Sequence, residues 1–253
     1  MFDILKNISA QEFLPMIIIS FCTSIISATV GMAGGTTLLS LMIWSMPVST
    51  AIPLHAAAQL MSNASRAWLL RIHIAWAIFF PFVLGSIMGN VLAFYFIKSF
   101  PWSSYFSLLI SVIVLYSLFG PEKQKTFSIG KFGYFILGTI IGFLGLFVGA
   151  TGLLLGPFII GSRLTKESTV ASQASMQTFN HALKIISFLF LGFVYQNYMG
   201  MILALLVGTF LGSLVGIHIL KHLKSDFFFI LFKFVLFISS LKIIYDFSMN
   251  FFK

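Results

Sequence analysis

Two stretches of the chain carry polar and cationic side chains at helical spacing within otherwise apolar sequence. Gln59, Asn63 and Arg66 stand at positions i, i+4 and i+7, so they share one face of a helix. A second stretch repeats this pattern with Gln177, Asn180, His181 and Lys184. Each of these two polar stripes ends in a cation, and neither contains a carboxylate. The stripes therefore favour a small, negatively charged ligand.

Each stripe residue also has an interpretation that needs no ligand. Arg66 lies near the end of its apolar stretch, where a long side chain can extend to an interface. Gln59 and Gln177 suit hydrogen bonds between helices equally well. His181 suits either a packed position or proton coupling, because imidazole titrates near neutral pH. Lys184 lies nearer the middle of its stretch, which favours contact with a ligand or its pathway.

Glycine-rich breaks interrupt two other apolar stretches, at Gly31–Gly35 and at Gly149–Gly152. A short helix that begins at Thr36 and Thr37 would point its free N–H groups and positive dipole end at the first break, which suits an anion. In the second half the short helix is expected to begin near Leu153. The candidate ligand-binding residues at the breaks are Gly34, Gly35, Thr36, Thr37, Thr151 and Gly152. The alternative is that these glycines only permit close helix packing.

The composition identifies a lipid bilayer as the surroundings of the chain. Of 253 residues, 59% are hydrophobic and 8% are charged, against about 45–50% and about 25% in soluble domains. These values exclude a soluble enzyme, a disordered chain and a nucleic-acid-binding domain. The formal charge of +9 comes from basic residues in short gaps between apolar runs, as in the cytoplasmic loops of membrane proteins. Met1–Glu12 lacks the pattern of a removable signal peptide, and the single Cys22 excludes an intrachain disulfide.

Apolar runs of about 20 residues, the length of a membrane-spanning helix, fill most of the chain. These runs are too long for the strands of a barrel and lack their alternation. We therefore predict an all-α integral membrane protein in which residues 1–253 form a single transmembrane domain. The predicted segments are 13–46 (broken at 31–35), 50–70, 74–97, 102–119, 132–161 (broken at 149–152), 167–194, 200–220 and 227–247, with a polar linker at 120–131.

The two halves of the chain, about residues 13–119 and 132–247, repeat each other. A shift of 118 residues matches Gly31 with Gly149, Gln59 with Gln177 and Arg66 with Lys184, and a shift of 123 residues matches Gly85 with Gly208 and Gly89 with Gly212. Matches in this order, at the same places relative to the apolar runs, indicate duplication. Glycines at four-residue spacing predict tight helix packing or the face of a homodimer; these are Gly85, Gly89, Gly208, Gly212 and Gly216.

The distribution of Lys and Arg predicts how the broken segments sit in the membrane. If both segments enter and return as hairpins, nine of these residues lie on one side and three on the other; if both cross, the counts are seven and five. The positive-inside rule therefore favours hairpins. Three crossings then remain in each half, so the halves are inverted repeats with both termini outside the cytoplasm. The nine residues are Arg66, Arg71, Lys123, Lys125, Lys131, Arg163, Lys166, Lys221 and Lys224.

Other chemistries find little support in the sequence. The chain has no GxxxxGK[ST] loop, so it does not hydrolyse ATP itself. His55 and Gln59 share a helical face, but no Cys, Asp or Glu joins them, which disfavours a metal site. None of the six acidic residues lies in the middle of a span, unlike the carboxylate relays of proton pumps. We expect a protein that is not an enzyme and needs no cofactor.

Taken together, the motifs resemble the sulfite exporter TauE/SafE family. The resemblance rests on GMAGGTTLL and GFLGLFVGATGLLLGPF at the breaks and on AIPLHAAAQLMSNASRAW and VASQASMQTFNHALK in the stripes, and it extends from about Leu14 to Phe247. The family pattern at the break resembles GxGGGxxxxP. Here the first half lacks the proline, and the second keeps Pro157 but has Thr151 and Leu153 in place of glycines. The resemblance implies a bacterial cytoplasmic-membrane protein of two homologous halves that moves sulfite, organosulfonates or other sulfur-containing anions.

We therefore predict a secondary transporter, specifically an exporter, that moves such an anion by alternating access. The anion would lie between the two breaks, held by helix N-termini, threonine hydroxyls and the stripes, with Lys184 and Arg66 as counter-charges. The expected partners are this small anion and the lipid bilayer, with a homodimer as an option and no nucleic acid. Two alternatives stay open: an anion channel built from the same residues, and a structural subunit of a membrane complex.

Overall fold

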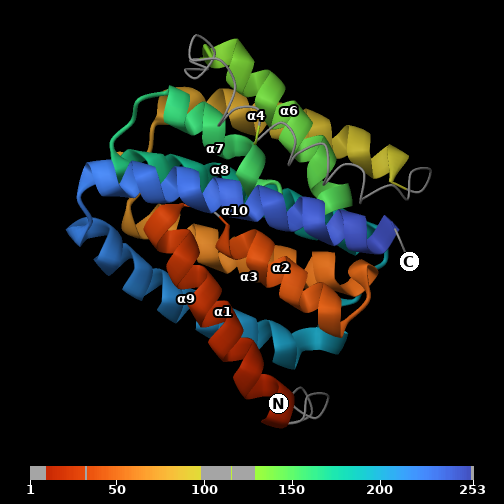
Figure 1. Ribbon diagram of the computed structural model, residues 1–253. Coiled ribbons are helices and arrows are strands. Elements are labelled where there is room, and N and C mark those ends of the chain that lie inside the picture. The colour runs from red at the N-terminus through yellow and green to blue at the C-terminus, as the bar shows by residue number, and fades with distance from the viewer. Residues whose placement is uncertain (1–9, 32, 98–114, 116–128, 252–253) are drawn as a thin grey trace.

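The computed structural model describes residues 10–31, 33–97, 115 and 129–251, and helices dominate this part of the chain (Figure 1). The predicted all-α class is therefore confirmed for the described residues. Apart from residue 115, the predicted segment 102–119 lies outside them, as does most of the linker 120–131. The helices are α1 (Ala10–Val30), α2 (Gly34–Ser45), α3 (Val48–Leu69), η2 (Arg71–His73), α4 (Trp76–Phe96), α6 (Lys131–Val148), α7 (Gly152–Gly161), α8 (Lys166–Phe190), η4 (Tyr195–Tyr198), α9 (Met199–His222) and α10 (Ser225–Phe251).

Helices α3 and α8, which carry the two polar stripes, pack against each other in the centre of the molecule. The pair α1 and α9 lies on one side of them and the pair α4 and α6 on the other (Figure 1). Most of the polar side chains of α3 and α8 are buried. Lipid offers polar side chains no hydrogen-bond partners, so the two polar helices are enclosed by the more apolar ones.

Three helices among the described residues are long enough and apolar enough to cross a membrane: Trp76–Phe96, Lys131–Val148 and Tyr195–His222. The sequence had predicted more spans. Helices α3 and α8 have the length, but their stripes make them too polar to meet the same criterion. Large apolar side chains on the outer helices are exposed, among them Leu84 on α4 and Ile230 on α10. Exposed apolar side chains on the outer helices suit contact with lipid.

Glycines bring the two outer helix pairs into close contact. On α4, a Cβ atom at Gly89 would lie 1.9 Å from the carbonyl oxygen of Thr139 on α6. On α9, a Cβ atom at Gly212 would lie 2.3 Å from the carbonyl oxygen of Phe21 on α1. Similarly close approaches are made by Gly85, Gly208 and Gly216. The predicted tight packing is confirmed, and it occupies these glycine faces within one chain.

Replacing Gly89 by alanine is expected to lower the free energy of unfolding by about 1–3 kcal/mol, the usual cost of overpacking. The added methyl group would overlap a backbone oxygen, which cannot move without shifting α6. Gly130→Ala is the matched control, because nothing lies within 4 Å of the Cβ atom added there. Thermal unfolding of the purified protein in detergent measures both. Equal melting temperatures for the two variants would contradict the close packing.

Each short helix folds back beside the helix that precedes it. Gly34, at the start of α2, lies against the carbonyl group of Thr23, well before the end of α1. In the second half, the Tyr134 hydroxyl near the start of α6 donates to the carbonyl oxygen of Phe158 at 3.1 Å and hydrogen-bonds to the Ser162 hydroxyl. The end of α7 therefore lies next to the start of α6.

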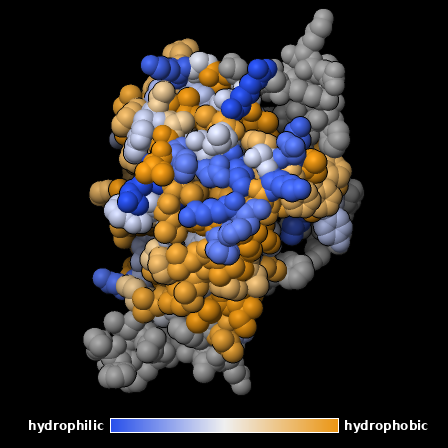
Figure 2. All heavy atoms as spheres, turned by 90° about the vertical axis from the view of Figure 1, so that its left-hand side faces the viewer, coloured by the Kyte–Doolittle hydropathy of each residue, from blue (hydrophilic) through white to orange (hydrophobic). Residues whose placement is uncertain are grey.

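Several helix ends meet at one end of the molecule, on the left of Figure 1. The Lys166 ammonium group, at the start of α8, donates to the carbonyl oxygens of Leu220 at 3.0 Å and of Leu223, at the end of α9. The Ala75 amide, just before α4, donates to the Ser172 hydroxyl at 2.9 Å. Figure 2 shows this end face-on, with hydrophilic side chains gathered on it. The turns and helix ends that meet here carry Arg71, Lys131, Arg163, Lys166, Lys221 and Lys224.

Candidate functional site

The two breaks depend on residues with positive φ. Gly31 ends α1 with φ 91°, and Gly149 ends α6 with φ 76°, a conformation that glycine adopts without steric cost. Ala33 also has a positive φ, 67°, which costs a residue with a Cβ atom on the order of 1–3 kcal/mol. The backbone of the first break is therefore held in an unfavourable conformation by its surroundings.

Both short helices present free N–H groups at the breaks. Helix α2 begins at Gly34, two residues before the predicted Thr36, because it resumes directly after its turn. Helix α7 begins at Gly152, next to the predicted Leu153. The residue before each helix makes no side-chain capping hydrogen bond. The first N–H groups of a helix have no partner within it. Both N-termini therefore offer hydrogen-bond donors and a positive dipole end to a ligand.

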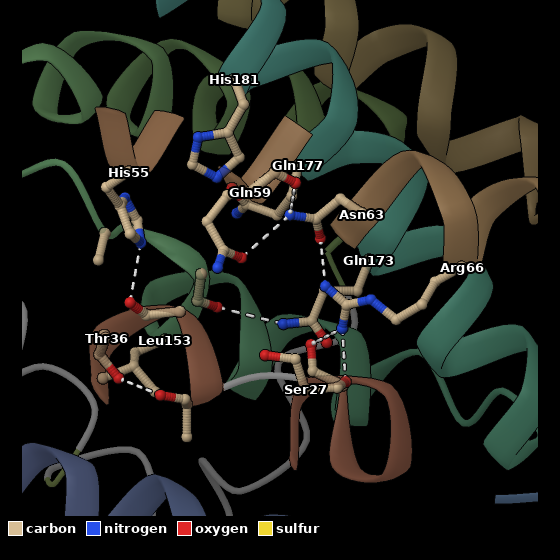
Figure 3. A pocket seen from close by; sticks show the side chains of 15 residues that line it. Ser27, Thr36, His55, Gln59, Asn63, Arg66, Leu153, Gln173, Gln177 and His181 are labelled. Atoms are coloured by element: carbon tan, nitrogen blue, oxygen red, sulfur yellow. Dashed lines mark hydrogen bonds between the residues drawn. The ribbon is translucent and has the colours of Figure 1, made fainter. Parts of the chain in front are cut away.

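A cavity of about 30 Å³ lies where the two breaks meet α3 and α8 (Figure 3). Its volume is enough for about two water molecules. The predicted candidates that line it are Gly35, Thr36, Gln59, Asn63, Arg66, Gly152, Gln177 and His181. It is also lined by Ser27, Gly31, Ala33, His55, Ala150, Leu153 and Gln173. Residues from both halves of the chain thus converge on one buried space.

Arg66 is buried, with 2% of its surface exposed, so the predicted alternative that it extends to an interface is wrong. Its guanidinium group donates to the carbonyl oxygen of Ser27 at 2.5 Å, to that of Gly31 at 3.5 Å and to Asn63 Oδ1 at 2.7 Å. All of these acceptors are neutral. A buried cation that lacks a counter-ion is costly, so an anion in the cavity would be strongly attracted to Arg66.

The remaining predicted candidates do not line the cavity; they are Gly34, Thr37, Thr151, Asn180 and Lys184. Gly34 faces α1, where a Cβ atom would lie 1.8 Å from the carbonyl oxygen of Thr23. Lys184 is fully buried, and its ammonium group donates to the carbonyl oxygen of Gly149 at 2.5 Å. Asn180 Nδ2 lies 3.4 Å from Thr151 Oγ1. Lys184 and Asn180 therefore contact the second break outside the cavity.

Several polar atoms at the cavity are buried and have no hydrogen-bond partner among the described residues. They are both amide atoms of Gln177, Gln173 Oε1, and the Nδ1 atoms of His55 and His181. An unpaired buried polar atom costs about 1–3 kcal/mol. A group of them around one space is the arrangement expected of a site that a polar ligand fills.

Comparison with protein families identifies the chain. The model of the sulfite exporter TauE/SafE family matches residues 16–243. The protein belongs to the sulfite exporter TauE/SafE family. Members of the TauE/SafE family are transporters rather than enzymes, so this chain is a membrane transport protein with a small-molecule substrate. No curated protein and no solved structure matches the chain.

Three polar residues of the TauE/SafE cavity were not predicted as ligand-binding: Ser27, His55 and Gln173. Gln173 and His55 each stand four residues before a predicted stripe glutamine, so each stripe is one helical turn longer than predicted. That spacing is the signal that could have found them. Ser27 contributes its carbonyl group to Arg66, and no side-chain pattern predicts a contact made by the backbone.

Proposed function

We propose that this TauE/SafE protein is a secondary transporter that exports a small oxyanion or sulfonate, such as sulfite, across the bacterial cytoplasmic membrane. One observation carries the proposal. Two free helix N-termini, the buried Arg66 guanidinium group and amide side chains of both stripes converge on one cavity, and no carboxylate among the described residues lines it. Helix N-termini and charged donors bind oxyanions in many proteins.

The small volume of the cavity supports a closed state of a transport cycle. About 30 Å³ is space for about two water molecules, and an oxyanion with three or four oxygens needs more. Two parts of the lining can yield to a ligand. The two amide atoms of Gln177 have no partner among the described residues, and a Cβ atom at Gly152 would meet only Gln177 Nε2, at 3.9 Å. The anion would enter when one side of the cavity opens.

Matching helix ends support the proposed duplication. Three pairs of helix ends are each separated by 118 residues: Val30 and Val148, Gly34 and Gly152, and Val48 and Lys166. The stripe cations also make matching hydrogen bonds, Arg66 to the Gly31 carbonyl and Lys184 to the Gly149 carbonyl. Paired, broken helices at the meeting point of two repeats are typical of secondary transporter binding sites.

The helix contacts favour two moving bodies that differ from the two sequence halves. One body is α1, α2, α3 and α9, and the other is α4, α6, α7 and α8; they meet mainly where α3 packs on α8. Helices α9 and α4 are thus exchanged between the halves. The cavity lies at this meeting, so rocking of one body against the other would open it to alternate sides of the membrane.

The cationic end shown in Figure 2 is proposed to face the cytoplasm. Cytoplasmic loops are enriched in Lys and Arg, and the turns at this end carry most of the cations among the described residues. The return of α7 to the start of α6 supports the hairpin arrangement for the second break.

Ligand-dependent thermal unfolding of the purified protein tests the anion site. A ligand at 100 times its dissociation constant stabilises the fold by about 2.7 kcal/mol. We expect sulfite, thiosulfate or sulfoacetate to raise the melting temperature, and acetate and choline to leave it unchanged. Saturable counterflow of the same anion in proteoliposomes would then separate a carrier from a channel. A folded sample that responds to none of the sulfur oxyanions and sulfonates would overturn the proposal.

A further inference from the structure

Two histidines face each other across the contact between α3 and α8. The rings of His55 and His181 meet edge to face, with centroids 5.8 Å apart. Both side chains line the cavity, and both are buried, with 1% and 4% of their surface exposed. His55 Nε2 lies 2.8 Å from the carbonyl oxygen of Gly35, and the Nδ1 atom of each ring has no hydrogen-bond partner in the part of the chain that the structure describes. Figure 3 shows both rings at the cavity.

The two histidines depart from the relation between the halves. At the shift of 118 residues, His55 corresponds to Gln173 and His181 corresponds to Asn63. Both amides also line the cavity, so an amide fits such a position. What an imidazole adds, and an amide lacks, is a ring nitrogen that can take up and release a proton.

The other charges near this pair are positive. Arg66 on α3 and Lys184 on α8 are both buried, whereas α1, α2 and α7 bring no titratable side chain to the cavity in the described part of the chain. Tyr134 and Lys166 are buried at the cationic end and do not line the cavity. An anion attracts a protonated imidazole beside it. By linkage, an anion and a proton then favour each other's binding in this cavity.

We propose that the His55–His181 pair takes up one proton together with the anion, so that the two cross the membrane in the same direction. The inference rests on the proposed anion site and adds its coupling ion. No covalent bond changes: a proton leaves water on one side, occupies an imidazole nitrogen while the anion is bound, and is released with the anion on the other side. Cotransport of a proton with a monovalent anion moves no net charge, so export would be driven by the outward concentration gradient of the anion itself.

Proteoliposomes with a pH dye inside test this coupling. Methanesulfonate, sulfoacetate and sulfate serve as probes, because they carry no proton of their own near neutral pH, unlike sulfite. For a probe that is transported, net inward movement is expected to acidify the lumen with about one proton per anion. For methanesulfonate, the rate is expected to be independent of a potassium diffusion potential. Anion uptake without acidification would overturn the inference and leave the proposed function intact, whereas no uptake of any probe, of sulfite or of thiosulfate would remove both.

The residues at the corresponding positions of the other half supply variants that test the role of the two histidines. His55→Gln and His181→Asn introduce the residues that the other half carries at the corresponding positions. The measured quantity is the ratio of protons to anions moved, which a packing role would not change. We expect this ratio to fall at least tenfold in each variant or in the double variant. His218→Gln, at an exposed site on α9, should keep the wild-type ratio. An unchanged ratio in the double variant would assign the proton to another group.

Discussion

Arg66→Gln is expected to weaken anion binding about 10- to 100-fold. The guanidinium group supplies a full positive charge and a fork of donors at the cavity. A hydrogen bond to a charged group contributes about 1.5–3 kcal/mol, and about 1.4 kcal/mol is a factor of ten in affinity. Glutamine is shorter and neutral. The measurement is the anion concentration that gives half of the maximal thermal stabilisation.

One further variant separates the charge of Arg66 from its shape, and a second variant serves as a control. Arg66→Lys keeps the charge but cannot hold the Ser27 carbonyl and Asn63 with one planar group, so an intermediate affinity is expected. Arg71→Gln removes an exposed cation that lies over the Trp68 ring and should leave the affinity unchanged. If Arg66→Gln binds the anion as tightly as the wild type, Arg66 is not part of the site.

Gly152→Val is expected to abolish anion binding while leaving the fold intact. A Cβ atom at this position meets only Gln177 Nε2, 3.9 Å away, and the residue lines the cavity. The valine side chain would therefore occupy the space that the anion needs without forcing the backbone apart. We expect no anion-dependent rise in melting temperature and at least a tenfold loss of counterflow, with a ligand-free melting temperature close to that of the wild type.

Gly34→Val is the informative contrast to Gly152→Val. Both residues begin a short helix, but a Cβ atom at Gly34 would lie 1.8 Å from the carbonyl oxygen of Thr23. Gly34→Val should therefore reduce the ligand-free stability, which Gly152→Val should not. Similar losses of stability in both variants would show that the cavity has no room beside Gly152.

Much of the fold could be predicted from the sequence because its signals are local. Each apolar run within the described residues forms helix, and the short helices begin within two residues of the predicted positions. Helical spacing also predicts which stripe residues share one face of a helix. Five of these residues line the one cavity: Gln59, Asn63, Arg66, Gln177 and His181. These features follow from helical periodicity and from the conformational preferences of glycine.

The depth of each side chain could not be predicted in the same way. Arg66 and Lys184 occupy corresponding sequence positions, yet the first lines the cavity and the second does not. A Cβ atom at Gly145 would lie 2.7 Å from Lys184 Cε, so a missing side chain on α6 leaves the room that the lysine fills. The pairing of His55 with His181 likewise depends on a contact between distant helices. Helical spacing assigns a residue to a face and says nothing of what that face meets.

The exchange of α4 and α9 between the halves also sets an order of assembly during synthesis. The glycine face of α4 meets α6, which follows soon after it in the chain, whereas α1 meets the glycine face of α9, which is made much later than α1. Helix α1 thus waits for its partner while the helices from α2 to α8 are produced. Contacts between distant segments form late and leave intermediates exposed. A nascent chain that stops before α9 therefore leaves α1 without the helix that it packs against most extensively in the folded protein.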